Sequence, residues 1–290
     1  MRRTAGGFLY DFVVYAVIVL VCIVTLYPFI YVLSVSVSEP NSVLKNEVIL
    51  LPKGFNLNSY ATVLKYDGIW VAYLNTLFYT VVGTSISLIM TALAAYPLSR
   101  KDWKFRNTGT IFLAITLWFG GGMIPFFLVF RHLNLLDTRL SVLLYAAIST
   151  FYIIVMRTYF ESLPKELEES AKIDGANDLR ILWTIVVPLS KPVFAVIGLY
   201  YAVAKWNSFF WEMILLKNNA LMPLQVMLVR IIRDSVFGQE IQRVMTQGEK
   251  VIPITIQYSA IVITVLPIIM VYPFLQKYFV KGVMIGAIKS

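Results

Sequence analysis

The stretch that decides how this chain is organised is EESAKIDGAN, from Glu168 to Asn177. It is polar and lies between two strongly apolar segments of a 290-residue chain, in which 59% of the residues are hydrophobic and 14% are charged. Soluble domains carry about 25% charged residues. The composition therefore predicts a membrane protein, and the charged stretch must lie outside the hydrocarbon core.

Six apolar runs are long enough to cross a bilayer, which takes about 20 residues of helix. We expect an all-α membrane protein with six transmembrane helices in one transmembrane domain, 1–290. The expected spans are 12–37, 73–97, 108–130, 140–160, 191–211 and 256–276. The longer connectors are 38–72, 161–190 and 212–255, and none is long enough for a separate soluble domain. The first run is too long for the apolar core of a signal peptide, so we expect it to be retained.

The orientation follows from Lys and Arg near the span ends, because cytoplasmic loops retain positive charge. This bias is clearest in the short loop RKDWKFR, Arg100–Arg106. Both termini and the loop 161–190 are therefore expected to be cytoplasmic, and the loops 38–72 and 212–255 to be outside. In the second outer loop, PLQVMLVRIIRDS, from Pro223, has apolar residues at helical spacing and predicts a helix.

The spans contain almost no ionisable chemistry. All sixteen carboxylates fall in connectors or at span ends, with Asp11 and Glu212 nearest to the bilayer. Lys205, near the outer half of the fifth span, is the basic exception, and its long side chain can snorkel outward. The single histidine, His132, cannot supply a metal site alone. A membrane enzyme or a secondary carrier would be expected to hold charged groups in its spans, so we expect neither catalysis nor a bound cofactor or metal.

The third apolar run is interrupted by FGGGM, Phe119–Met123. No Lys–Ser/Thr pair follows it, so it is not a phosphate-binding loop. Glycines within a span allow either close helix approach or a break, and Pro125 favours the break. The expected role is structural, and a break at mid-membrane would also make this segment part of a pathway.

The connector 161–190 is predicted to fold as two short helices around a glycine elbow. Pro164 can take the first helical position, and three glutamates follow in the early turns, where the helix dipole favours anions. Gly175 can adopt the left-handed conformation that ends a helix, and Asn177 or Asp178 can cap the next one. One face of that second helix is predicted to combine Leu179, Leu182, Trp183 and Val186. On local grounds the element is either a surface hairpin or a docking site for a partner.

This connector resembles the EAA loop of ABC-importer permeases. The resemblance is carried by Glu169-Ser170-Ala171-Lys172-Ile173-Asp174-Gly175-Ala176, followed by Ile185 and by Pro188-Leu189-Ser190-Lys191-Pro192. Ser170 stands where this motif commonly has an alanine. The Asn75-Thr76 pair and WNSFFWEMIL, from Trp206, resemble the carbohydrate-importer subfamily. The segment Phe119–Thr138 is similar to the branch associated with complex oligosaccharides and polysaccharide fragments, which includes alginate importers.

This resemblance implies the type I ABC-importer permease fold with a cytoplasmic coupling helix, in the bacterial cytoplasmic (inner) membrane. The cargo would be a sugar or oligosaccharide, for example an acidic polysaccharide fragment, and the alternative is a stand-alone secondary sugar carrier. The implied partners are a second homologous permease, two ATPase subunits that bind ATP and Mg, an extracytoplasmic solute-binding protein and membrane lipid, with no nucleic acid. The implied ATPase-coupling residues are Glu169, Ser170, Ala171, Asp174, Gly175, Ala176 and Pro188.

Candidates for the substrate path are aromatic and amide side chains, because aromatic faces suit the apolar faces of sugar rings and amides supply hydrogen bonds. They are Asn75, Tyr79, Trp118, Trp206, Asn207 and Trp211. For each of them the residues alone favour a lipid-facing or helix-packing role over substrate contact, since aromatic residues also populate membrane interfaces.

Overall fold

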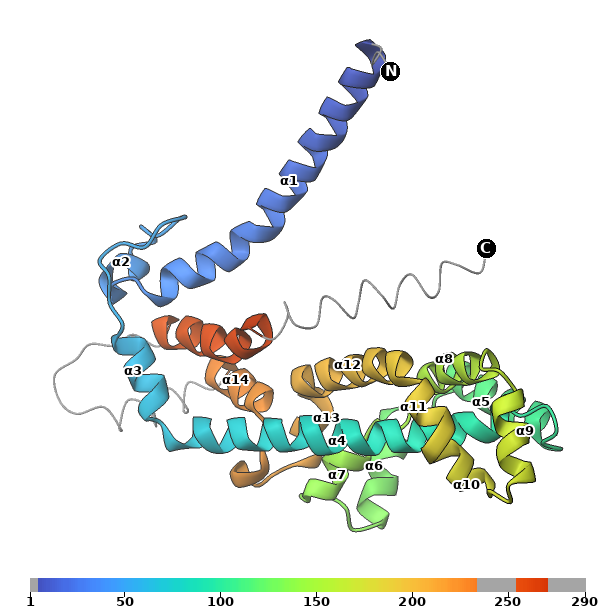
Figure 1. Cartoon of the computed structure of the whole chain (residues 1–290). Helices are drawn as coiled ribbons and strands as arrows, with labels where there is room; N and C mark the ends of the chain where they lie inside the picture. Colours follow the sequence, from blue (N-terminus) through green and yellow to red (C-terminus); the bar gives the residue numbers. More distant parts are fainter. Residues whose placement is uncertain (1–4, 234–253, 271–290) are drawn as a thin grey trace. The chain divides into compact units, whose positions relative to one another are not determined.

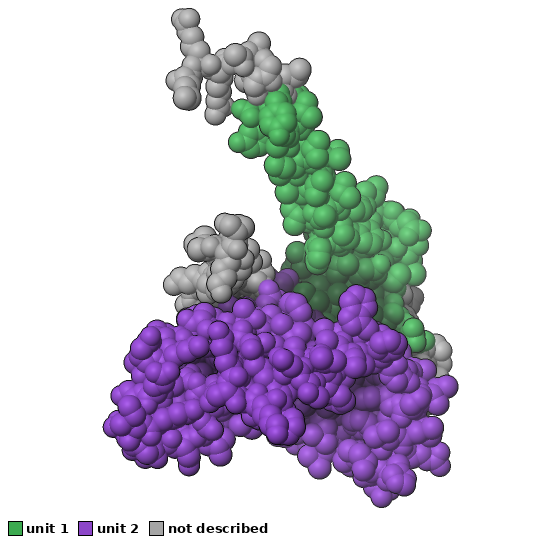
Figure 2. All heavy atoms as spheres, turned by 90° about the vertical axis from the view of Figure 1, so that its right-hand side faces the viewer, with its two compact units in different colours: residues 1–70, 228–268 green, residues 71–227, 269–290 purple. Residues whose placement is uncertain are grey.

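The computed structural model describes residues 5–233 and 254–270. Within these residues every regular element is helical, and the only strand-like feature is an isolated bridge between Ser38 and Phe55. The chain divides into two compact units, Met1–Trp70 with Leu228–Ile268 and Val71–Met227 with Ile269–Ser290 (Figure 2).

The first unit begins with a long apolar helix, α1 (Ala5–Ser36), followed by the short helices α2 (Pro40–Leu44) and α3 (Asn58–Lys65). From Tyr10 to Ser36, α1 is long and apolar enough to cross a membrane alone. Most of its side chains in this stretch are exposed, as expected for a helix whose surroundings are lipid. The helix Ile254–Met270 packs against the end of α1, where the Ser259 hydroxyl donates to the Ser36 carbonyl at 3.3 Å.

The second unit is built around α4, whose C-terminal end runs alongside α5 and α8 in Figure 1. The helices from here on are α4 (Asp67–Ser99), α5 (Arg106–Trp118), α6 (Met123–His132), α7 (Arg139–Leu144), α8 (Thr150–Glu161), α9 (Glu166–Ile173), α10 (Asp178–Ile181), the π-helical turn η1 (Leu182–Val186), α11 (Val187–Leu189), α12 (Lys191–Asn207), α13 (Phe210–Leu215), the 3-10 turn η2 (Asn219–Leu221) and α14 (Leu224–Arg233). The helix predicted from Pro223 is confirmed as α14.

Several predicted spans are not single helices. The third, 108–130, bends by 115° between α5 and α6, and Gly122 at the break has a φ of 78°, which confirms the predicted interruption. The fourth, 140–160, is interrupted between α7 and α8, where Ala146 has a φ of 50°. The fifth, 191–211, ends its main helix at Asn207 before the short α13 begins.

Two described helices, Tyr10–Ser36 and Asp67–Ser99, are long and apolar enough to cross a membrane alone. Two bent helix pairs raise this number to four if each pair is counted as one span. The sixth predicted span, 256–276, lies partly outside the described residues. The count of six spans therefore stays a prediction.

The main core of the second unit joins α4, α8, the connector and α12. Its most buried members include Ala95, Met156, Ile181 and Ile197, each at most 1% exposed. The connector thus contributes its own side chains to this core, because Ile181, Leu182 and Val186 are all buried there. A movement of the connector must therefore displace side chains packed against α4, α8 and α12.

Candidate functional site

The polar stretch folds as the predicted helix and elbow. Helix α9 ends at Ile173, and Gly175 adopts a φ of 81°. The Gly175 N–H donates to the Lys172 carbonyl at 3.0 Å, and the Ala176 N–H donates to the Ala171 carbonyl at 2.9 Å. This pair of bonds is the Schellman arrangement, which requires a left-handed residue after the helix. The predicted terminator at Gly175 is confirmed.

Asn177 begins the second helix, because its side-chain oxygen accepts a hydrogen bond from the Arg180 N–H at 2.8 Å. The predicted face of this helix is only partly right. Leu182 and Val186 are buried, whereas Leu179 is 60% and Trp183 42% exposed. Trp183 lies in the π-helical turn, whose wider spacing departs from the 3.6-residue period on which the prediction depends, whereas Leu179 precedes this turn. The helical stretch Asp178–Leu189 then meets α12 at a bend of 86°.

Helix α9 is tied to the C-terminal end of α4 by ion pairs. Arg100 pairs with Glu168, and Lys172 pairs with Asp102 at 3.3 Å. The Arg100 guanidinium also lies over the Tyr96 ring, 4.8 Å from its centroid, and donates to the Tyr96 hydroxyl at 2.9 Å. The backbone N–H of Asp102, together with Lys172, lowers the pKa of the Asp102 carboxyl below its ordinary value. The elbow is therefore held against the end of a membrane helix.

A second set of charges joins α5 to α8 beside this elbow. Glu161 accepts a hydrogen bond from Arg106 at 2.6 Å and another from Arg157 at 2.9 Å. Burial alone would raise the pKa of Glu161, but these two guanidinium groups outweigh it and lower that pKa. The loop 99–107 and the helices around it are thus held together by several charged pairs.

The residues proposed for ATPase coupling divide into two groups. Ala171 and Ala176 are half-buried and pack against the main core. Glu169, Ser170, Asp174, Gly175 and Pro188 are exposed. The neighbouring Ile173 is 86% exposed, and a Cβ on Gly175 would meet nothing within 4 Å. The elbow therefore presents an open surface with an apolar side chain at its tip.

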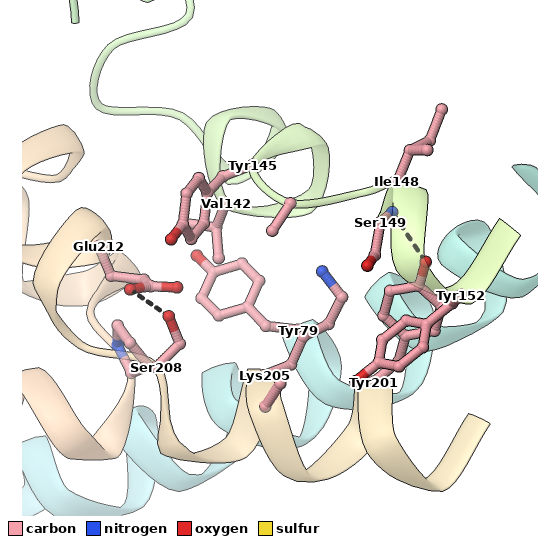
Figure 3. Close-up of a pocket in the computed structure, with 13 residues that line it drawn as sticks. Tyr79, Val142, Tyr145, Ile148, Ser149, Tyr152, Tyr201, Lys205, Ser208 and Glu212 are labelled. Carbon is pink, nitrogen blue, oxygen red and sulfur yellow. Dashed lines mark hydrogen bonds between the residues drawn. The ribbon is translucent and has the colours of Figure 1, made fainter. Parts of the chain in front are cut away.

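A cavity of about 250 Å³ lies in the second unit, lined by residues of α4, α7, α8, α12 and α13 (Figure 3). Four of its lining residues are tyrosines: Tyr79, Tyr145, Tyr152 and Tyr201. The Tyr79 hydroxyl donates to the Leu221 carbonyl at 2.8 Å, and the Tyr201 hydroxyl accepts from the Ser149 N–H at 3.0 Å. With these hydroxyls fixed by the backbone, the rings are held in place as walls.

The cavity also holds two charged residues, Lys205 and Glu212. Glu212 is 4% exposed and accepts a hydrogen bond from the Ser208 hydroxyl at 2.8 Å. The Lys205 stem lies on Gly83 of α4, where an added Cβ would come within 2.8 Å of the lysine Cδ. The amine of Lys205 points into the cavity (Figure 3), and the outward snorkelling of this side chain stays a prediction.

Of the six candidates for the substrate path, only Tyr79 lines this cavity. Asn75 is buried and ties α4 to the following loop, donating to the carbonyls of Ala220 at 2.8 Å and Met222 at 3.2 Å. The Asn75 oxygen also accepts from Arg139 at 3.3 Å. Among the described residues, the side-chain hydrogen bonds of Asn75 are thus all made to other groups of the protein.

The remaining four candidates lie elsewhere. Trp118, at the end of α5, is 84% exposed. Asn207 is exposed and donates to the Val203 carbonyl at 2.9 Å, one turn earlier in α12. The Trp206 indole N–H is buried without a hydrogen-bond partner among the described residues. Trp211 packs on Phe126, with ring centroids 4.4 Å apart.

Comparison with protein families gives the match that the elbow and the apolar helices lead one to expect. Residues 68–285 match the family described as "Binding-protein-dependent transport system inner membrane component". The chain belongs to this family. It is therefore an inner-membrane permease subunit of an ABC importer rather than an enzyme, and the alternative of a stand-alone secondary carrier is set aside.

Relatives of this permease cover nearly its whole length. It is 38% identical over 282 residues to the polygalacturonan/rhamnogalacturonan transport system permease protein YtcP of Bacillus subtilis (strain 168), covering 97% of this chain and 99% of that protein. It is 25% identical to the arabinooligosaccharides transport system permease protein AraQ of Halalkalibacterium halodurans, covering 93% of each. A crystal structure of a bacterial ABC transporter involved in the import of the acidic polysaccharide alginate matches with a TM-score of 0.88 and 38% identity, covering 96% of this chain and 99% of that one.

Proposed function

We propose that this permease forms half of the translocation path for an oligosaccharide derived from an acidic polysaccharide. A second homologous permease supplies the other half, and an extracytoplasmic solute-binding protein delivers the cargo. The observation that carries this proposal is the elbow at Gly175. It is an exposed, rigidly capped element, tied to α4 by Arg100 and built into the core at Ile181.

The chemical class of the cargo is supported by two relatives of equal identity to this chain. One is named for polygalacturonan and rhamnogalacturonan, and the other transporter is described as importing alginate. Both descriptions refer to polysaccharides that contain uronic acids, which carry a carboxylate on the sugar ring. The more distant relative is named for arabinooligosaccharides, which are neutral. The identities of 38% and 25% favour the acidic class.

Energy is proposed to come from two partner ATPase subunits that bind ATP and Mg. Helix α9 would enter a cleft of one ATPase subunit, with Glu169 making polar contacts, Ser170 and Ala171 allowing close approach, and Gly175 setting the elbow. Asp174, Ala176 and Pro188 would complete this surface. Closure of the ATPases would then reach α4 through Arg100 and the core through Ile181. Movement of an element with two packed arrangements is the physical basis of such coupling.

The proposal includes the six-span topology, with both termini and the elbow in the cytoplasm. The charged loop 100–106 supports this orientation. The 86° bend before α12 is also consistent with it, because it lets Asp178–Leu189 lie across the cytoplasmic ends of the spans.

Co-purification of the importer from membranes tests this proposal. An ATPase subunit should remain bound to the wild-type permease and should be lost on Glu169→Arg, while the second permease is retained. Ser170→Ala is the matched control, since it restores the residue common in the motif on the same exposed surface. Retention of the ATPase by Glu169→Arg would contradict docking at this elbow.

A further inference from the structure

The cavity contains a cation that nothing in the described part of the molecule neutralises at contact distance. The Lys205 amine makes no hydrogen bond or ion pair with any described residue, and Glu212 is its only described electrostatic neighbour. In Figure 3 its amine points into the cavity, with the Tyr79 ring between it and Glu212 in that view. Ionisable groups inside a membrane protein are costly and are typically kept for transport or binding.

The position of this cation follows from its place on α12 and from its contact with Gly83. Lys205 lies near the end of α12 opposite Lys191, about 21 Å along the helix at 1.5 Å per residue. Its stem rests on Gly83, and an added Cβ at that position would come within 2.9 Å of the lysine Cε and 3.2 Å of its Nζ. A larger residue at position 83 would therefore push the amine away from its present place.

Glu212 differs from Lys205 in its surroundings. Its carboxylate accepts the Ser208 hydroxyl and is set into the wall at 4% exposure. The lysine amine instead projects among tyrosine rings whose hydroxyls are already bonded to the backbone at Tyr79 and Tyr201. Aromatic walls with one projecting cation suit a sugar ring that carries one carboxylate, because the ring packs on the walls and the carboxylate meets the amine.

We propose that this cavity is a binding subsite for a uronic acid unit of the cargo, in which the Lys205 amine binds the sugar carboxylate. This inference rests on the proposed function and adds to it a location and a residue. Glu212 and Ser208 would then hold the opposite wall, and their oxygens would accept hydrogen bonds from sugar hydroxyls.

The test uses the whole importer in proteoliposomes with its binding protein outside and ATP inside. The two cargo probes are trigalacturonate and its fully methyl-esterified form, which share the same sugar backbone and differ in that each carboxylate is replaced by a neutral methyl ester. Each variant is compared with wild type for each probe separately, so that the preference of the binding protein cancels. Lys205→Met should raise KM for the acid about tenfold or more, as loss of a hydrogen bond to a charged group does, and change uptake of the ester less than twofold.

Three further variants separate charge from folding. Lys205→Arg should retain uptake of the acid, and Gly83→Ala should weaken it by displacing the amine without removing the charge. If Lys205→Met does not assemble, the double variant Lys205→Met/Glu212→Gln removes both cavity charges and should show the same selective loss. Lys217→Met is the control, because it removes an exposed positive charge that does not line the cavity.

Equal loss for both probes, or no loss for the acid, would overturn the subsite. If the wild type does not transport the ester, saturation-transfer NMR of trigalacturonate with the complex lacking the binding protein decides instead, and binding must disappear with Lys205→Met and survive Lys205→Arg. Failure of the wild type to import trigalacturonate at all would overturn the proposed cargo and the subsite with it. Wild-type import that Lys205→Met leaves unchanged would overturn the subsite alone.

Discussion

Arg100, just beyond the C-terminal end of α4, forms an ion pair with Glu168 in the first turn of α9. Their side chains are 17% and 10% exposed, so the pair is largely shielded from water. The same guanidinium lies over the Tyr96 ring, which is part of the main core. Arg100 thereby connects the elbow to a membrane helix, alongside the more exposed pair of Lys172 and Asp102.

Removing one member of this pair should destabilise the permease. Arg100→Met leaves the Glu168 carboxylate buried without its cation, at a cost of about 3–5 kcal/mol. The double variant Arg100→Met/Glu168→Met should be less damaging, because no unpaired charge remains. Thermal unfolding of the purified importer in detergent measures both. A double variant that is less stable than Arg100→Met would show that the pair does not act as a unit.

Gly175 should tolerate substitution only by residues that accept a left-handed backbone. Gly175→Leu costs about 1–2 kcal/mol of local strain, although there is open space around the position. We expect the variant to insert normally but to hydrolyse ATP without uptake. Gly175→Asn is the control, because asparagine visits this conformation readily, and it should keep most of the coupling. Wild-type uptake by Gly175→Leu would falsify the assignment of the elbow to coupling.

Stability should fall in acid through Glu161. Because Arg106 and Arg157 lower its pKa in the folded protein, this carboxylate contributes stability at any pH above its ordinary pKa of 4.5. That contribution disappears as the pH falls through the lowered folded value. Glu161→Gln should therefore be less stable than wild type at pH 7, and the difference should shrink below about pH 4.5. Melting curves across this range, with Glu166→Gln at an exposed position as control, check the slope.

Substitution of Asn75 should impair assembly of the importer more than its selection of cargo. Asn75→Ala leaves the Ala220 carbonyl and the Arg139 guanidinium without this partner, at a cost of about 1–3 kcal/mol. We expect less assembled importer but an unchanged KM in the fraction that assembles. If Asn75→Ala assembles normally but has a raised KM, Asn75 contacts the cargo, as predicted from the sequence.

Where local chemistry determines structure, the sequence was sufficient. The Gly175 terminator and the Asn177 cap depend only on residues within a few positions, and both are present as predicted. The break after Phe119 likewise follows from three consecutive glycines. These features need no knowledge of which helices pack together.

Other features depend on packing between helices and have little local signal in the sequence. The interruption before α8 contains neither glycine nor proline, yet Ala146 takes a positive φ there. Trp183 is 42% exposed within the π-helical turn, although the 3.6-residue period placed it on the same broad face as Val186. The direction of Lys205 depends on Gly83, more than 120 positions away, and only the fold brings the two into contact.

The central claim is that this permease moves an acidic oligosaccharide using energy received at its elbow. Uptake of labelled trigalacturonate into proteoliposomes, with ATP supplied only inside, tests it most directly. We predict uptake that requires both the binding protein and ATP, and that Gly175→Leu abolishes while ATP hydrolysis continues. Uptake that persists in Gly175→Leu, or that proceeds without ATP, would contradict the account.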